Sequence, residues 1–172
     1  MKNLHFILWA LLIIVFAVLA GQNFYITHHH ESLPIFSLET ASANEGKAIL
    51  DTLAKKNIEG VSLLHFAQVN TWLDFFFIIG YVGAIIMISY SLMQKEKQPF
   101  INNFLRFDIL LALIIGLLDV VENIILLNDM HDYKIDKQYI SSMHVSDPKW
   151  ILVIIVLVSW LVSLLNRAFK RS

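Results

Sequence analysis

Four long apolar runs alternate with polar segments along this 172-residue chain. The runs cover residues 4–26, 72–93, 104–127 and 149–169. Each has about the 20 residues that an α-helix needs to cross the hydrocarbon core of a bilayer. The pattern predicts an all-α protein, a four-transmembrane-helix bundle in which residues 1–172 form a single membrane domain.

The first run has two interpretations. It follows Lys2 and contains Val18-Leu19-Ala20, which resembles a signal-peptidase site. The apolar character continues past this tripeptide, through Phe24 to Ile26. We therefore expect the run to be retained as a membrane anchor.

The segment between the first two runs, residues 27–71, is too long for a simple turn. Ser42-Ala43-Asn44-Glu45 has capping-box spacing, and apolar residues from Ile49 to Leu53 follow at helical intervals, which predicts a short amphipathic helix. Beyond a break at 57–60, spacings of three and four predict a second helix that runs into the next apolar run. We expect a helical extracytoplasmic cap between helices 1 and 2, with an interfacial helix on the lipid headgroups as the alternative.

Composition agrees with a polytopic membrane protein. The chain is 57% hydrophobic and 16% charged, its mean hydropathy is +0.64 and its formal net charge is −1. It contains no cysteine, which excludes disulfides, thiolate nucleophiles, cysteine-ligated zinc and iron–sulfur clusters. Four spans leave room for one modest outer segment but none for a separate catalytic domain.

Lysine and arginine placement predicts the orientation. One side carries basic residues with few acids: Lys2, Lys95, Lys97, Arg106, Arg167, Lys170 and Arg171. The other side, with residues 27–71 and the loop 128–148, mixes lysines with many acids. We therefore predict an N-in/C-in topology, with the cap outside.

Three polar residues lie deep inside the third run. Asp119 is roughly 15 Å of helical rise from Ile109, which places it near the membrane midplane, and Glu122 and Asn123 lie about one turn farther on. An acid at this depth costs about 2.5–3.5 kcal/mol on insertion scales, so we expect these side chains to face the protein interior. Small residues at 112 and 116 share their stripe, as in close helix contacts.

Two residues of neighbouring runs lie at similar depth. Asp74 lies two residues inside the second run and Lys149 opens the fourth, and a lysine stem can reach inward from the interface. We expect Lys149 to pair with Glu122 or Asp74, which leaves Asp119 deeper and protonated, while Asn123 donates to a carboxylate. The cluster of Asp74, Asp119, Glu122, Asn123 and Lys149 is the candidate site.

Three roles remain open for this cluster: a buried network that fixes helix register, a ligand or ion site, and a catalytic acid/base pair. The first functional hypothesis is a nonenzymatic membrane module, with lipids around it and a homo-oligomeric assembly, that binds or passes a proton, a cation or a small polar or lipidic ligand. The second is an intramembrane enzyme acting on lipid headgroups, with outer histidines as metal ligands. The third is a membrane-perturbing effector or accessory subunit regulated by a protein partner. No feature indicates nucleic-acid binding, and no cofactor is expected.

Several histidines fall on the predicted outer side. The weak metal-ligand candidates are His28, His30, His65, His131 and His144. Adjacent histidines cannot all face one ion, and no HExxH spacing places two on one helical face. We expect no specific metal site, and no pair of transmembrane histidines is present to hold a haem.

Short motifs carry a resemblance: Leu73 to Ile78 with Tyr81, the D-x-x-E-N element at 119–123, and the lysine that opens the last run. In these the chain resembles a loose group of small bacterial four-helix integral membrane proteins of unassigned function. The resemblance implies the four-helix architecture, a shared polar site and a location in the bacterial inner membrane.

Overall fold

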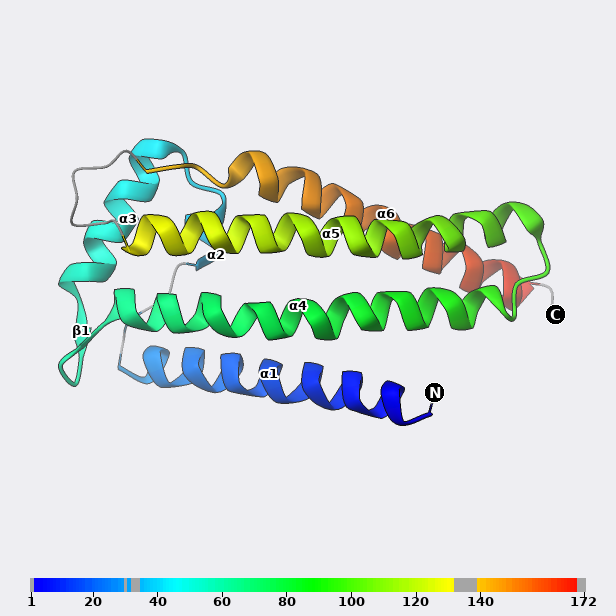
Figure 1. Ribbon diagram of the computed structural model, residues 1–172, viewed down its shortest axis with the longest axis horizontal. Coiled ribbons are helices and arrows are strands. Elements are labelled where there is room, and N and C mark those ends of the chain that lie inside the picture. Colours follow the sequence, from blue (N-terminus) through cyan, green and yellow to red (C-terminus); the bar gives the residue numbers. More distant parts are fainter. Residues whose placement is uncertain (1, 30, 32–34, 132–138, 170–172) are drawn as a thin grey trace.

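The computed structural model describes residues 2–29, 31, 35–131 and 139–169, with six helices and one two-stranded hairpin among them. Four helices are long and apolar enough to cross a membrane, as predicted: α1 (Lys2–His28), α4 (Leu63–Met93), α5 (Pro99–His131) and α6 (Met143–Phe169). Consecutive membrane-length helices run in opposite directions (Figure 1). Each is longer than its apolar run, because polar turns extend it at one or both ends.

The four helices form a row rather than a closed square. α4 packs between α1 and α5, and α5 packs between α4 and α6, while α4 and α6 touch each other only slightly. α6 crosses behind α5 at an angle (Figure 1). α5 is consequently the most buried of the four, and α1 is the most exposed. This layout leaves one face of α5 accessible between α4 and α6.

Glycines allow a close approach at two of these helix–helix contacts, α1 with α4 and α4 with α5. Gly80 and Gly83 of α4 face Leu12 and Leu8 of α1, and a Cβ on Gly116 of α5 would lie 2.7 Å from Val82. Small residues let helix backbones approach inside a bilayer, where apolar burial itself provides little attraction between helices. The expectation of a close helix contact at Gly116 is confirmed.

A cap covers one end of the bundle, which we call the cap end. It consists of α2 (Ile35–Glu39), α3 (Ala43–Lys55) and the hairpin of β1 (Asn57–Ile58) and β2 (Val61–Ser62). The capping box is present, since the N–H and hydroxyl of Ser42 both donate to Glu45 Oε2, at 3.0 and 2.6 Å. The helices predicted from the capping box and from the spacing after residue 60 are confirmed.

The hairpin was not foreseen. Its turn residues Glu59 and Gly60 have φ of 51° and 85°, the left-handed values that a tight two-residue hairpin requires. Ser62 then accepts a hydrogen bond from the His65 N–H at 3.3 Å and so caps α4. The break at residues 57–60 is therefore a reversal of direction that leads straight into a membrane helix.

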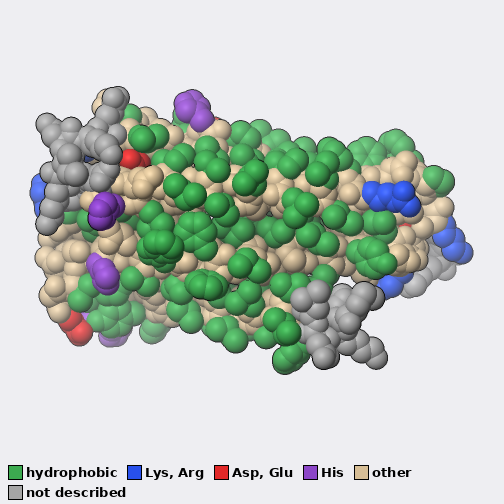
Figure 2. Space-filling view, viewed as in Figure 1, with side chains coloured by type: hydrophobic (Ala, Val, Ile, Leu, Met, Phe, Trp, Pro, Cys, Tyr) green, Lys and Arg blue, Asp and Glu red, His purple; other side chains and the backbone are tan. Residues whose placement is uncertain are grey.

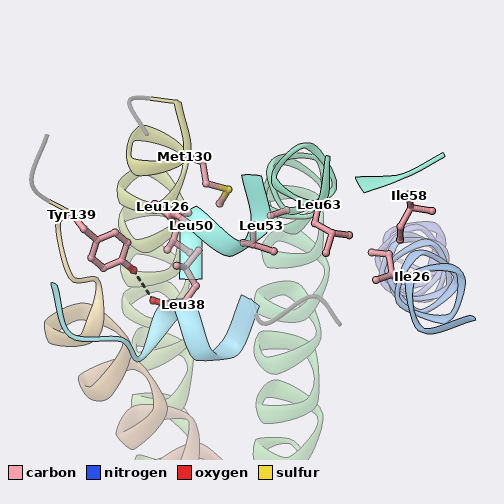
Figure 3. Close-up of a cluster of buried hydrophobic side chains, with 10 residues drawn as sticks. Ile26, Leu38, Leu50, Leu53, Ile58, Leu63, Leu126, Met130 and Tyr139 are labelled. Carbon is pink, nitrogen blue, oxygen red and sulfur yellow. Dashed lines mark hydrogen bonds between the residues drawn. The ribbon is translucent and has the colours of Figure 1, made fainter. Parts of the chain in front are cut away.

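Buried apolar side chains fix the cap to the bundle (Figure 3). The cluster consists of Ile26, Leu38, Leu50, Leu53, Ile58, Leu63, Ala67, Leu126, Met130 and Tyr139. It joins α1 through α5, and the Tyr139 hydroxyl donates to the Leu38 carbonyl at 2.7 Å. The last residue of α2, Glu39, is thereby held above the interior of the bundle.

Gly46 tests whether this junction carries stability. A Cβ at this position would lie 2.1 Å from the Tyr139 ring, so Gly46→Ala must displace the ring from the cap cluster. We expect a loss of about 1–3 kcal/mol of stability, measured by thermal unfolding in detergent. Gly21→Ala in α1 is the control, because its Cβ meets nothing within 4 Å. Equal midpoints for the two variants would contradict a packed cap.

Candidate functional site

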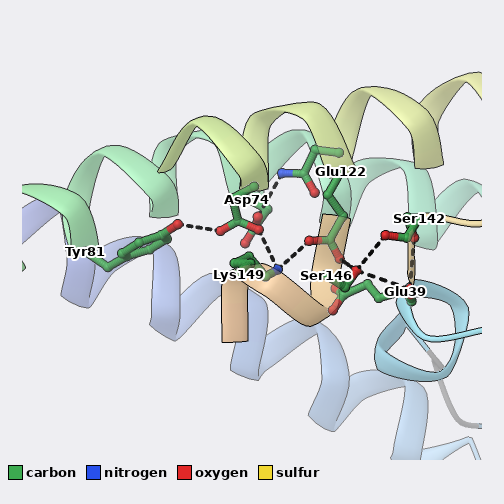
Figure 4. A network of polar contacts seen from close by, with 9 residues as sticks. Glu39, Asp74, Tyr81, Glu122, Ser142, Ser146 and Lys149 are labelled. Carbon is green, nitrogen blue, oxygen red and sulfur yellow. Dashed lines mark hydrogen bonds and ion pairs between the residues drawn. The ribbon is translucent and has the colours of Figure 1, made fainter. Parts of the chain in front are cut away.

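One buried lysine is shared by two acids of α5. Lys149 Nζ donates to Asp119 Oδ1 at 2.7 Å and to Glu122 Oε2 at 2.5 Å. The three side chains are only 6%, 12% and 1% exposed, respectively. They are neighbours because positions 119 and 122 lie one turn apart on α5 and face the first turns of α6 (Figure 4). In a low-dielectric interior, removal of one member of such a triad leaves an uncompensated buried charge, which strongly destabilises the fold.

Hydroxyl groups complete the triad. Tyr81 of α4 donates to Asp119 Oδ2 at 2.6 Å, and Ser146 of α6 donates to Glu122 Oε1 at 2.8 Å. Both oxygens of each carboxylate therefore accept a hydrogen bond. Sequence reasoning did not assign either hydroxyl, although Tyr81 follows Asp74 by seven residues and Ser146 precedes Lys149 by three, both helical spacings.

Asp74 and Asn123 form a second pair beside the first. Asn123 Nδ2 donates to Asp74 Oδ2 at 2.8 Å and so links α5 to α4. All five residues predicted from the sequence thus lie close together, in two hydrogen-bonded groups (Figure 4). Lys149 binds Glu122, one of the two predicted alternatives, and does not bind Asp74, the other. The expectation that Asp119 is left out of this pairing is wrong, because Lys149 also donates to Asp119. α6 begins at Met143, so Lys149 starts one to two turns inside the helix and reaches the deeper acid.

The cap contributes Glu39, which sequence reasoning missed. Its carbonyl accepts hydrogen bonds from the hydroxyls of Ser142 and Ser146, at 3.0 and 3.2 Å (Figure 4). Burial, followed by the nearby Glu122, raises the pKa of the Glu39 carboxyl to about 8, although Lys149 acts to lower it. Glu39 is therefore mostly protonated at neutral pH. No spacing could have found it, since it lies more than thirty residues before its partners in the chain.

Several of these groups, namely Glu39, Asp74, Tyr81, Asp119 and Lys149, line a cavity of about 360 Å³ between α4 and α6. Carboxyls and the lysine lie at its cap end, while the rest of its wall is apolar and aromatic. The lining residues are Glu39, Asp74, Phe77, Tyr81, Ile85, Ile115, Asp119, Lys149, Trp150, Val153, Val156, Leu157 and Trp160. Trp150 and Leu157 are 44% and 53% exposed, so the cavity opens sideways on the surface that faces lipid.

Charge is unbalanced at the polar end. The Lys149 ammonium binds the carboxylates of Asp119 and Glu122, and two further carboxyls, those of Glu39 and Asp74, lie at the same end of the cavity. Unneutralised carboxylates in low dielectric are costly, so the surplus must be met by protons or by a bound cation. The site therefore attracts positive charge.

The histidines lie elsewhere. Within the described residues, no three histidine, aspartate or glutamate side chains gather in a way that could hold a metal ion. His65 and His131 line a separate pocket at the cap end of α4 and α5, and His28, on α1, stacks with Phe24. His144 lies in the first turn of α6, and His30 lies outside the described residues.

No protein-family model, curated protein or solved structure matches this chain.

The contribution of the triad to stability can be tested by substitution. Lys149→Met leaves two buried carboxylates without their cation and should cost about 3–5 kcal/mol. The loss should be larger at neutral than at mildly acidic pH, where protons neutralise the stranded acids, and Glu122→Gln should partly rescue it. Thermal unfolding in detergent measures all three variants.

Lys55→Met, an exposed lysine of α3, is the matched control and should unfold like the wild type. Strictly additive losses for Lys149→Met and Glu122→Gln, with no pH dependence, would show that the two side chains do not interact.

Proposed function

We propose that this protein is a nonenzymatic membrane module that binds an amphiphile with a cationic head. The observation that carries the proposal is the polarity of the cavity. Its cap end is lined by the carboxyls of Glu39, Asp74 and Asp119 and by one ammonium, that of Lys149, which also pairs with Glu122, and its walls beyond are apolar. A cationic head at Asp74 and Glu39 supplies the missing positive charge. An apolar tail then lies along Phe77, Ile85 and Val153.

The size and lining of the cavity support this ligand class. Its volume falls within the range of about 300–1,000 Å³ that is usual for small-molecule sites. Tyr81, Trp150 and Trp160 contribute aromatic faces, which attract quaternary ammonium groups. Lys149 already lies over the Trp150 ring, 5.2 Å from its centroid. The carboxyls and the rings therefore favour the same head group.

Access also favours a ligand that partitions into lipid. Because α4 and α6 barely touch, the cavity opens between them toward the bilayer rather than along the bundle axis. An amphiphile can enter from the membrane with its tail inside the hydrocarbon and its head at the depth of the carboxyls. A free hydrophilic cation lacks this route.

Binding of dodecyltrimethylammonium, well below its micelle concentration, tests the proposal in nonionic detergent by thermal shift or native mass spectrometry. We expect one molecule per chain, and about tenfold weaker binding to Asp74→Asn, equivalent to roughly 1.4 kcal/mol. Affinity should rise between pH 7 and 9 because Glu39, with a pKa of about 8, becomes negative over this interval. Glu39→Gln should remove that rise.

Asp51→Asn is the control, since Asp51 belongs to cap helix α3 and does not line the cavity. Dodecanoate, with the same tail and a negative head, should bind far more weakly. Equal binding of the two amphiphiles, or unchanged binding to Asp74→Asn, would refute the proposal.

A second candidate is an enzyme acting on lipid headgroups. The observation in its favour is the Glu39 carboxyl, whose pKa of about 8 suits a general acid or base near neutral pH. Asp74 lines the same cavity end. Turnover of a copurified lipid that stops in Glu39→Gln would favour this reading over ligand binding.

We further propose that the protein resides in a bacterial inner membrane with the cap outside. Most of the Lys and Arg side chains visible in Figure 2 lie away from the cap end, and the visible histidines lie toward it. Lys95, Lys97 and Arg106 flank the α4–α5 connection at that opposite end. Basic residues concentrate on the cytoplasmic side of membrane proteins.

Single cysteines report this orientation, because the native chain has none. In intact cells an impermeant thiol reagent should label Lys55→Cys in the cap but not Lys95→Cys after α4, and both should label after lysis. Both positions are exposed in the structure, so burial does not mask either one. Labelling of Lys95→Cys alone in intact cells would reverse the orientation.

A further inference from the structure

A second intramembrane acid lies outside the site described above. Asp108 of α5 is only 1% exposed and accepts a hydrogen bond from the Ser159 hydroxyl of α6. In the described part of the chain, no lysine or arginine forms an ion pair with it. A buried carboxylate without a cation is costly in low dielectric, whereas a carboxylic acid is not. The position therefore suits a group that takes up and releases a proton.

Few charged groups face Asp108 from the elements around it. α6 presents Ser159 and, one turn on, Ser163, with partly exposed Arg167 a further turn along. α4 presents Ser89, which accepts a hydrogen bond from the Trp160 indole at 2.8 Å. Arg106, two residues earlier on α5, is exposed.

Asp108 and Asp119 lie on one stripe of α5. Eleven residues separate them, which is about three turns and roughly 16 Å of rise, so both project toward α6. Ile115 and Val156 form the apolar middle of this interface. The two acids are too far apart to exchange a proton directly.

The cavity bridges most of that distance. It extends from Asp119 past Ile115 and Val156 to Trp160, the residue next to Ser159. Its 360 Å³ is space for roughly ten water molecules, more than a single file over this span needs. Ser159 and Asp108 do not line the cavity themselves, so the cavity ends at Trp160, one residue along the chain from the hydroxyl that binds Asp108.

Polar groups continue from Asp108 toward the end opposite the cap. Ser163 donates to Glu96 Oε2 at 3.2 Å, and Asn166 donates to Glu96 Oε1 at 3.0 Å. Burial raises the Glu96 pKa, but hydrogen bonds from the Gln98 N–H, Asn166 and Ser163 outweigh it and hold the pKa below its usual value. Glu96 is therefore an ionised proton acceptor at the end of this series of polar groups.

We propose that the chain conducts protons along the α5–α6 interface, with Asp119 as the station nearer the cap and Asp108 as the station nearer the opposite end. A proton enters on the Asp119 carboxylate, crosses the cavity through water, and passes to Asp108 and then toward Glu96. Each O–H bond formed is matched by one broken, and every carboxyl returns to its starting state. The net change is one proton moved, driven by the proton gradient. This activity goes beyond amphiphile binding and does not depend on it.

Proteoliposomes with an enclosed pH dye, an imposed pH gradient, and potassium with valinomycin to balance charge test the proposal. Wild-type protein should dissipate the gradient faster than protein-free liposomes. Asp108→Asn should slow this protein-dependent flux by about tenfold or more, while Asp108→Glu, which keeps a carboxyl, should retain most of it. Ser159→Ala should reduce the flux without abolishing it. Asp51→Asn should behave like the wild type.

Asp108→Asn should still bind dodecyltrimethylammonium, because Asp108 does not line the cavity, and this binding also reports that the variant is folded. A wild-type rate equal to that of empty liposomes, or equal rates for Asp108→Asn and wild type, would overturn the proton path. Neither outcome bears on amphiphile binding, which is tested by Asp74→Asn.

Discussion

The buried ammonium of Lys149 is the interaction on which the polar interior depends. It lies within 2.7 Å of two carboxylates from α5, and it is the cation that permits those acids to remain inside an apolar bundle. The hydroxyls of Tyr81 and Ser146 then satisfy the remaining carboxylate oxygens, so three helices are tied at one point. Because apolar burial contributes little to helix association inside a bilayer, such polar contacts and close glycine contacts determine which helix faces pack together.

The same arrangement explains why the bundle is open on one side. α5 lies between α4 and α6, which both contact its polar stripe but hardly touch each other. The cap closes the end of that stripe through Glu39, whose carbonyl is held by two serines of α6. What remains uncovered is the lateral cavity. Its polar end and apolar walls are thus a direct result of the helix order.

Helical spacing was sufficient to predict the parts of the site that lie on one helix. Asp119, Glu122 and Asn123 were found because acids stand out within an apolar run, and Lys149 because its stem can reach their depth. The prediction of which carboxylates Lys149 binds was correct for Glu122 but missed Asp119, since the depth of Lys149 depends on where α6 begins. Tyr81 and Ser146 were not assigned because tyrosine and serine are common in membrane helices and carry no charge that demands a partner.

Long-range contacts could not be read from spacing. Glu39 reaches the site only because Leu38 packs into the cap cluster and Tyr139, about one hundred residues later, bonds its carbonyl. Asp108 lies near the start of the third apolar run, where an acid suggests the membrane interface rather than the interior. The hairpin at residues 57–62 is too short to produce an alternating pattern.

The spacing of Asp108 and Asp119 has an electrical consequence. Their separation of roughly 16 Å along α5 is about half of the ~30 Å hydrocarbon core. A charge that moves between them therefore crosses about half of the transmembrane field, worth roughly 1 kcal/mol for each 100 mV. On the proposed proton path, the balance between protonation of the two acids would consequently shift with membrane voltage as well as with pH.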